Sequence, residues 1–173
     1  AYKLLEIDER DRILKPDMLV IDLGAAPGSW SQVARQKLKN TGNVIALDIL
    51  EMTPLPAVKF IHGDFREETI AAEIQKHFNN RRPDLVMSDM SPNMSGIVIS
   101  DQANSMHLAE LALAFSIDHL NYGGNFLVKT FQGRDFDQFL RAMRSSFKQV
   151  VIRKPKASRD RSNELYLLGI GKK

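Results

Sequence analysis

Four charged side chains, far apart in the sequence, have the types needed to move a proton. Lys129 lies inside an otherwise apolar stretch, residues 126–131, that has the composition of a strand. A lysine on an edge strand only reaches out to solvent, whereas a buried amine with a second cation nearby gives up its proton readily and can act as a general base. Lys3 could supply that cation. Asp89 and Glu164 could hold the ammonium of Lys129, provided that the fold brings the four side chains together.

Residues 18–30 have the pattern of a buried strand, a loop of small residues and a helix, in that order. Asp22 is the only polar residue in the run 18–23, which suits a central parallel strand covered on both faces. Residues 24–28 have so little side chain that another molecule could approach the backbone closely, and Ser29 can cap the helix. The unit is either an ordinary tight turn or the first half of a nucleotide-type site.

The glycine spacing in this loop excludes two common phosphate-binding motifs. No lysine follows Gly28, as G-x-x-x-x-G-K-[ST] requires, and only Gly24 and Gly28 are glycines, which excludes G-x-G-x-x-G. The loop is similar to the D-x-G-x-x-P-G pattern of S-adenosylmethionine (SAM) methyltransferases. SAM carries no phosphate, so the loop need only admit its methionine part, and an acid such as Asp22 could lie near its cationic groups.

Acidic residues follow successive predicted strands. Ligands of open α/β sheets bind at the carboxyl ends of the strands, and here those ends carry Gly24, Asp48, Asp64 and Asp89. Asp48 is about where an acid would accept hydrogen bonds from two ribose hydroxyls, and Asp64 is placed to receive an adenine amino group. One such acid often only caps the next helix, but three beside a glycine loop predict a SAM-type nucleoside site. Trp30 either packs the first helix or flanks the cofactor.

The alternation of strands and helices predicts an α/β, Rossmann-like fold. The predicted strands are 18–23, 44–48, 58–62, 84–89, 126–131, 150–152 and 164–170; the predicted helices are 1–14, 29–38, 67–78, 101–120 and 136–147. We expect a mostly parallel seven-stranded sheet with helices on both faces. No helix separates the last two strands, which predicts one antiparallel edge strand. Residues 90–100 are predicted to form a loop, and no apolar run approaches the ~20 residues of a membrane span.

The charge is distributed unevenly along the 173 residues. Residues 1–128 hold 12 lysines and arginines against 17 acids, whereas residues 129–173 hold 12 against 4. Such a basic region is either a solvated face or the footprint of a phosphate-backbone partner. Cysteine is absent, which excludes disulfides and thiolate catalysis. The four histidines have no metal-binding spacing, so no metal is expected.

Together these motifs resemble the FtsJ/RrmJ family of ribose 2′-O-methyltransferases. The shared segments are residues 1–6, 22–32, 88–96, 128–133 and 153–159 with 162–164, and they span essentially the whole chain. The resemblance implies transfer of the SAM methyl group to a ribose 2′-hydroxyl of RNA, most simply a uridine of 23S rRNA in the 50S subunit. It also implies a cytoplasmic monomer that needs no metal. Related enzymes modify tRNA or mRNA caps.

The resemblance also implies roles for individual residues. The Lys-Asp-Lys-Glu tetrad of the family would fall on Lys3, Asp89, Lys129 and Glu164, and its cofactor contacts on Gly28, Trp30, Asp48, Asp64 and Asp89. The RNA backbone would be held by Arg134, Arg141, Arg144, Lys148, Arg153, Lys154, Lys156, Arg159 and Arg161. The basic N-terminal extension of the family is absent, so we expect residues 1–173 to be a single SAM-dependent methyltransferase domain.

Two other classes of protein remain open. A small-molecule or protein methyltransferase can share the fold, but it has no need of a basic C-terminal quarter. A non-catalytic RNA-binding module would need the basic residues but not two lysines and two acids at strand ends.

Overall fold

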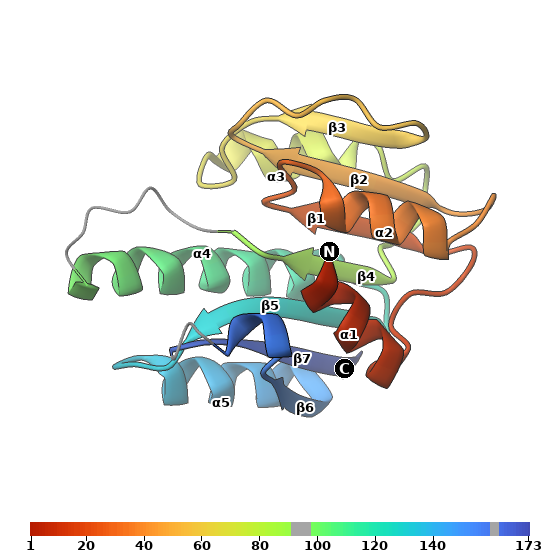
Figure 1. The fold of residues 1–173 in the computed structure, drawn as a ribbon. Helices are drawn as coiled ribbons and strands as arrows, with labels where there is room; N and C mark the ends of the chain where they lie inside the picture. Colours follow the sequence, from red (N-terminus) through yellow and green to blue (C-terminus); the bar gives the residue numbers. More distant parts are fainter. Residues whose placement is uncertain (91–97, 160–162) are drawn as a thin grey trace.

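Seven strands form one sheet in the order β3-β2-β1-β4-β5-β7-β6 in the computed structural model (Figure 1). It describes residues 1–90, 98–159 and 163–173, without the side chains of 98–102. The parallel strands are β1 (Leu19–Leu23), β2 (Asn43–Asp48), β3 (Val58–His62), β4 (Leu85–Ser88) and β5 (Asn125–Phe131). The strand order reverses between β1 and β4, which is where ligands bind in open α/β sheets.

The remaining two strands pair antiparallel. β7 (Glu164–Lys172) lies between β5 and β6 (Phe147–Arg153) and runs antiparallel to both. The predicted fold class is therefore confirmed, but the antiparallel strand lies one place in from the edge. Burial gives the reason, because almost every residue of β7 is buried while β6 exposes much of its length.

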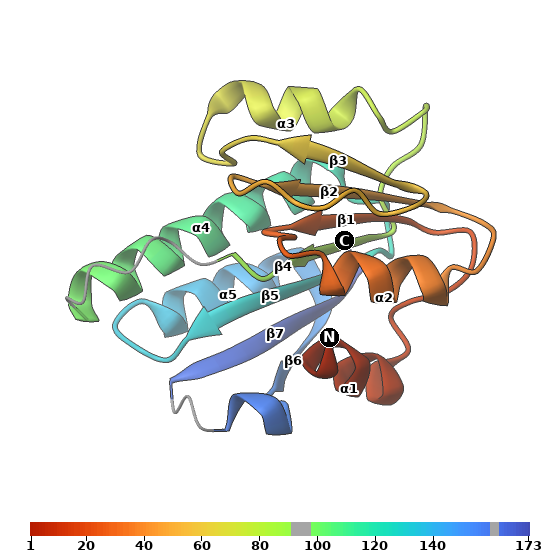
Figure 2. The ribbon, with the colours of Figure 1, turned by 45° about the horizontal axis from the view of Figure 1, so that its top comes forward.

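Helices cover both faces of the sheet. α1 (Tyr2–Asp11) and α2 (Ser29–Lys37) pack on one face (Figure 2). α3 (Glu68–Gln75), α4 (Val98–His119) and α5 (Phe136–Ser146) pack on the other. α4 begins earlier than predicted, and a short 3-10 helix, η1 (Lys156–Ser158), was not predicted. Among the helices that the structure describes, none is long and apolar enough to cross a membrane.

The N-terminal helix α1 is fastened to the C-terminal part of the chain. Leu4 and Ile7 are buried against the sheet, in the i, i+3 spacing of an amphipathic helix. The two carboxylate oxygens of Asp11 accept hydrogen bonds from the Arg153 guanidinium at 2.8 Å each. The Glu6 carboxylate accepts the backbone N–H of Lys156 at 3.1 Å. These contacts fix α1 beside the end of β6 and η1, and so fix any side chain near the start of α1.

Candidate active site

The pairing of β5 with β7 places two of the predicted site residues on one face of the sheet. Lys129 lies opposite Tyr166, and Phe131 lies opposite Glu164. Residues opposite each other, or two apart on one strand, point to the same face. Lys129 and Glu164 therefore share the face that α1 covers, where Tyr166 is packed. Lys3, in the first turn of α1, can reach them.

The four predicted tetrad residues form two ion pairs at the carboxyl ends of the strands. Lys3 Nζ lies 2.6 Å from Glu164 Oε1. Lys129 Nζ lies 3.4 Å from Asp89 Oδ1, and the Lys129 side chain is only 7% exposed. The structure thus brings together four charged groups that lie up to 161 positions apart in the sequence.

Glu164 is held in its charged form. Burial acts to raise the pKa of Glu164, but the hydrogen bond and charge of Lys3, the charge of Lys129 and the hydrogen bond from Ser158 together lower the pKa below its usual value. Ser158 Oγ donates to Glu164 Oε1 at 3.1 Å, and Lys154 Nζ donates to the backbone carbonyl of Glu164. A fixed carboxylate of this kind holds Lys3 in place.

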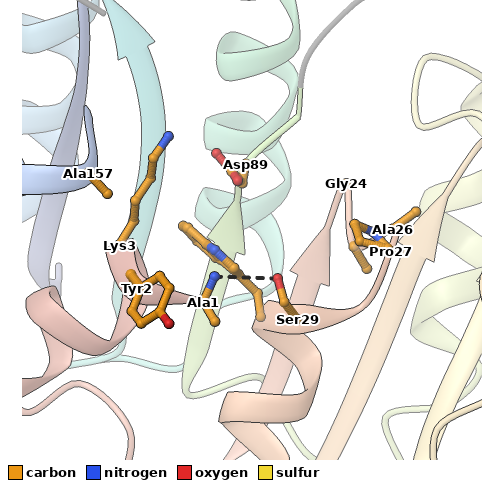
Figure 3. Close-up of a pocket in the computed structure, with 11 residues that line it drawn as sticks. Ala1, Tyr2, Lys3, Gly24, Ala26, Pro27, Ser29, Asp89 and Ala157 are labelled. Carbon is orange, nitrogen blue, oxygen red and sulfur yellow. Dashed lines mark hydrogen bonds between the residues drawn. The ribbon is translucent and has the colours of Figure 1, made fainter. Parts of the chain in front are cut away.

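A pocket of about 270 Å³ opens beside these ion pairs (Figure 3). It is lined by residues 1–3, the loop 24–27, Ser29, Trp30, Asp89 and Ala157 of η1. Two of the tetrad side chains, Lys3 and Asp89, thus border a space that a small molecule can enter. The pocket lies at the position predicted for a ligand, between the carboxyl ends of β1 and β4.

The loop between β1 and α2 packs against Met90 on one side and is hydrogen-bonded to Asp48 on the other. Gly24 has φ +76°, and a Cβ there would lie 2.8 Å from Met90 Cγ and 2.9 Å from Met90 Cα. The Asp48 carboxylate accepts the backbone N–H of Ala26 at 2.8 Å and that of Leu50 at 3.0 Å. Gly24, one of the small residues predicted to permit a close approach, is therefore also required by the packing of the loop.

The profile of the FtsJ-like methyltransferase family matches residues 1–172. The chain belongs to the FtsJ-like methyltransferase family. A protein of Nitrosospira multiformis named Ribosomal RNA large subunit methyltransferase E is 61% identical over all of this chain and 84% of its own length. A protein of the same name from Nitrosomonas eutropha is 60% identical, with 99% and 84% covered. The crystal structure of a ribosomal RNA methyltransferase from Plasmodium falciparum superposes with a TM-score of 0.89 at 29% identity, covering 99% of this chain and 95% of that one.

These matches confirm the family resemblance, the Rossmann-like fold of SAM-dependent methyltransferases and the enzyme class that the sequence predicted. In this FtsJ-like methyltransferase, Trp30 and Asp89 line the pocket, while Gly28, Asp48 and Asp64 lie outside its lining. Both Asp64 oxygens accept hydrogen bonds from Arg66, the shortest at 2.7 Å. These hydrogen bonds are the main reason that the pKa of Asp64 is lowered.

Sequence reasoning missed the tyrosine that fixes Asp89. Tyr166 is fully buried, and its hydroxyl donates to Asp89 Oδ1 at 2.9 Å. Its ring packs against Trp30, with the ring centroids 5.8 Å apart. The signal was present in the sequence, because a residue two positions after Glu164 in a strand points to the same face.

Two of the predicted RNA-binding residues have partners within the protein. Arg153 pairs with Asp11, and Lys154 donates to the backbone of Glu164. Six others are exposed: Arg134, Arg141, Arg144, Lys148, Lys156 and Arg159. Arg161 lies outside the described residues. So do residues 91–97, which fall within the predicted loop 90–100 and include most of the shared segment 88–96.

In the part of the chain that is described, no cluster of three His, Asp or Glu side chains could hold a metal ion.

The expectation that Asp22 lies near cationic ligand groups was wrong. Asp22 is fully buried in β1, because both faces of this central strand are covered. Ser31 Oγ donates to Asp22 Oδ2 at 2.6 Å, while Oδ1 has no partner among the described residues. The pKa of Asp22 is raised from 3.8 to about 7. Burial is the main cause, the hydrogen bond from Ser31 opposes it, and the nearby charges of Asp89 and Asp48 add to the rise.

This buried carboxyl should make the protein less stable as the pH rises. Between pH 3.8 and about 7 the folded state keeps a proton on Asp22 that the unfolded state releases, so the contribution of Asp22 to the free energy of unfolding falls with pH in this window and levels off above it. The slope from one such group is at most about 1.4 kcal/mol per pH unit. Urea unfolding across this range should show a shallower fall for Asp22→Asn, which carries no charge at any pH. Equal slopes for the two proteins would contradict the assignment.

Proposed function

We propose that the protein transfers the methyl group of SAM to a ribose 2′-hydroxyl of RNA, at a uridine of 23S rRNA in the 50S subunit. The observation that carries this proposal is the pair of lysines, each held by a carboxylate, beside a pocket at the switch point of the sheet. The relatives named for methylation of large-subunit ribosomal RNA support this substrate over tRNA or an mRNA cap. We further propose that the protein acts as a cytoplasmic monomer.

The residues around the pocket fit SAM. The loop 24–27 offers backbone and small side chains to the methionine part, and the Asp89 carboxylate at the pocket wall suits a cationic ligand. Asp48 ends β2 and Asp64 follows β3 at the same sheet edge, where they would face the nucleoside part. Gly28 caps α2 and Trp30 lies in its first turn, nearby. SAM, when bound, supplies an electrophilic methyl group on a sulfonium. We propose that this chemistry needs no metal.

The tetrad would then supply the base and the charge stabilisation. Bound SAM would supply its methyl group to the ribose hydroxyl oxygen and leave as the thioether, and Lys129 Nζ, as the unprotonated amine, would accept the proton of that hydroxyl. Asp89, fixed by Tyr166, orients Lys129 at 3.4 Å. Lys3, fixed by Glu164, stabilises negative charge that develops on the oxygen. Alignment of the hydroxyl with the methyl group is the other contribution of the site.

The decisive experiment measures methyl transfer from labelled SAM. The acceptors are 50S subunits, free 23S rRNA, tRNA and capped RNA, and the product is mapped to a nucleotide and to its 2′-oxygen. Transfer to a uridine of 50S or 23S rRNA is the expected result. Transfer only to tRNA or capped RNA, or only to protein or small molecules, would overturn the substrate. Binding of RNA without transfer to any acceptor would favour the non-catalytic module.

The exposed basic residues at the pocket end of the sheet should make RNA binding depend on salt. Lys156 begins η1, directly before the pocket residue Ala157, so its ammonium is near enough to contact an RNA phosphate. Lys156→Ala should reduce the slope of log affinity against log salt by about 0.7–0.9. Lys39→Ala is the matched control, because Lys39 is exposed and lies between α2 and β2, at the end of the sheet away from the pocket. Affinity that does not depend on salt would contradict an electrostatic RNA surface.

A further inference from the structure

We propose that Tyr2 is the stacking platform for the base of the acceptor nucleotide, which it holds outside the RNA stack at the mouth of the pocket. This inference rests on the proposed function and adds to it a residue that recognises the substrate. The relevant surface is one face of the Tyr2 ring, on the α1 side of the pocket, across from the loop that contains Gly24 and Pro27 (Figure 3).

Tyr2 combines two properties that the other aromatic residue of the pocket lining lacks. Its side chain lines the pocket and yet is 82% exposed. Trp30 also lines the pocket, but it is only 5% exposed, and its ring packs against Tyr166. Of the aromatic rings that line the described pocket, Tyr2 is therefore the one with a face open to an incoming base.

The position of the proposed base explains why such a platform is needed. The Lys129 side chain is 7% exposed, and its amine lies 3.4 Å from the carboxylate of the pocket residue Asp89. A ribose hydroxyl can therefore meet this amine only if the ribose itself enters the pocket beside Asp89. The base on that ribose must then leave the stack of its neighbours, which costs unstacking energy. Proteins offset this cost by stacking the extruded base on an aromatic side chain.

The helix geometry places the platform next to the chemistry. Tyr2 and Lys3 are consecutive in α1, so their side chains point about 100° apart around the helix axis. Lys3 reaches inward to Glu164 at 2.6 Å, while Tyr2 stands at the rim. A ribose beside Lys3 therefore carries its base within reach of the Tyr2 ring.

The chain offers a matched control for an exposed tyrosine. Tyr122 is 80% exposed, almost the same as Tyr2, but it lies between the end of α4 and the start of β5, at the end of the sheet away from the pocket. The Lys172 ammonium lies 5.5 Å from its ring centroid. Removing this ring tests the general effect of losing a surface tyrosine.

The test compares Tyr2→Ala, Tyr2→Phe and Tyr122→Ala in methyl transfer to 50S subunits, with SAM affinity measured separately by calorimetry. Loss of one base–aromatic stack should lower kcat/KM for the RNA about 5- to 150-fold in Tyr2→Ala. Tyr2→Phe keeps the ring and should keep the wild-type value, as should Tyr122→Ala. SAM affinity and the salt slope should be unchanged in all three, because no charge is removed and the proposed SAM contacts, the loop 24–27 and Asp89, stay in place.

Several outcomes would overturn the proposal. Wild-type kcat/KM in Tyr2→Ala would exclude any role of the ring, and an equal loss in Tyr2→Phe would assign the effect to the hydroxyl. If Tyr2→Ala also lost SAM affinity, or if Tyr122→Ala lost as much kcat/KM as Tyr2→Ala, the effect would not be recognition of the base. If the wild-type protein itself transferred no methyl group to RNA, the proposed function would fail instead, and the two failures are thus distinguishable.

Discussion

Lys129→Ala is expected to lower kcat for RNA methylation by about 10²- to 10⁴-fold, the usual effect of removing a general base. The substitution takes away the amine that lies 3.4 Å from Asp89 Oδ1. Asp89 keeps its hydrogen bond from Tyr166 at 2.9 Å, so the pocket wall should stay in place. Single-turnover kinetics with 50S subunits and SAM calorimetry together measure the effect, and SAM affinity should remain that of the wild type.

Lys59→Ala is the control for this loss, since Lys59 is an exposed lysine on β3 and is not among the predicted RNA-binding residues. It should leave kcat unchanged. Near-normal turnover in Lys129→Ala would refute the role of base. A fall in SAM affinity of the same size as the fall in kcat would instead assign Lys129 to cofactor binding.

Gly24→Ala is expected to abolish SAM binding and to destabilise the fold by about 2–5 kcal/mol. A residue with a Cβ at φ +76° is strained by about 1–2 kcal/mol. The added carbon would also lie 2.9 Å from Met90 Cα, a backbone atom that cannot move alone, and such overpacking adds about 1–3 kcal/mol. The loop and Met90 must shift to make room, which displaces the pocket wall. Denaturant unfolding and SAM calorimetry measure the two effects.

Gly123→Ala tests the backbone strain alone, without a steric contact like the one between a Cβ at position 24 and Met90. Gly123 has φ +79°, but a Cβ there would meet no atom within 4 Å. This variant should lose only about 1–2 kcal/mol of stability and should bind SAM normally. If the two variants were equally destabilised and both bound SAM, the packing of Gly24 against Met90 would have no part in the cofactor site.

The elements of this fold were predictable because each central strand is a short apolar run that ends at an acid or a glycine. β1, β2 and β4 lie within about one residue of their predicted bounds for this reason. The position of β7 was not predictable in the same way. Which strands pair is decided by contacts between distant segments, here β5 with residues 164–172, and local patterns do not record them.

The site was predictable to a different degree at each residue. The strand-end acids and Lys129 stand out locally, because each is a charge next to an apolar run. Asp22 also interrupts an apolar run, but its face of the sheet is covered by other segments, and so the ligand role expected for it failed. Arg153 was counted as a basic surface residue because its partner, Asp11, is 142 positions away and only the folded chain brings them together.

The place of β7 inside the sheet has a consequence for how the enzyme is made. The ribosome synthesises β5 and β6 before β7, and in the folded protein each of them pairs with β7. A nascent chain that ends before residue 164 therefore holds two strands with open edges, and it lacks the carboxylate that positions Lys3. The loop, the pocket wall and Lys129 are all synthesised by then. Catalytic competence thus arises only as the final strand inserts, so truncated products of translation should be inactive rather than partly active.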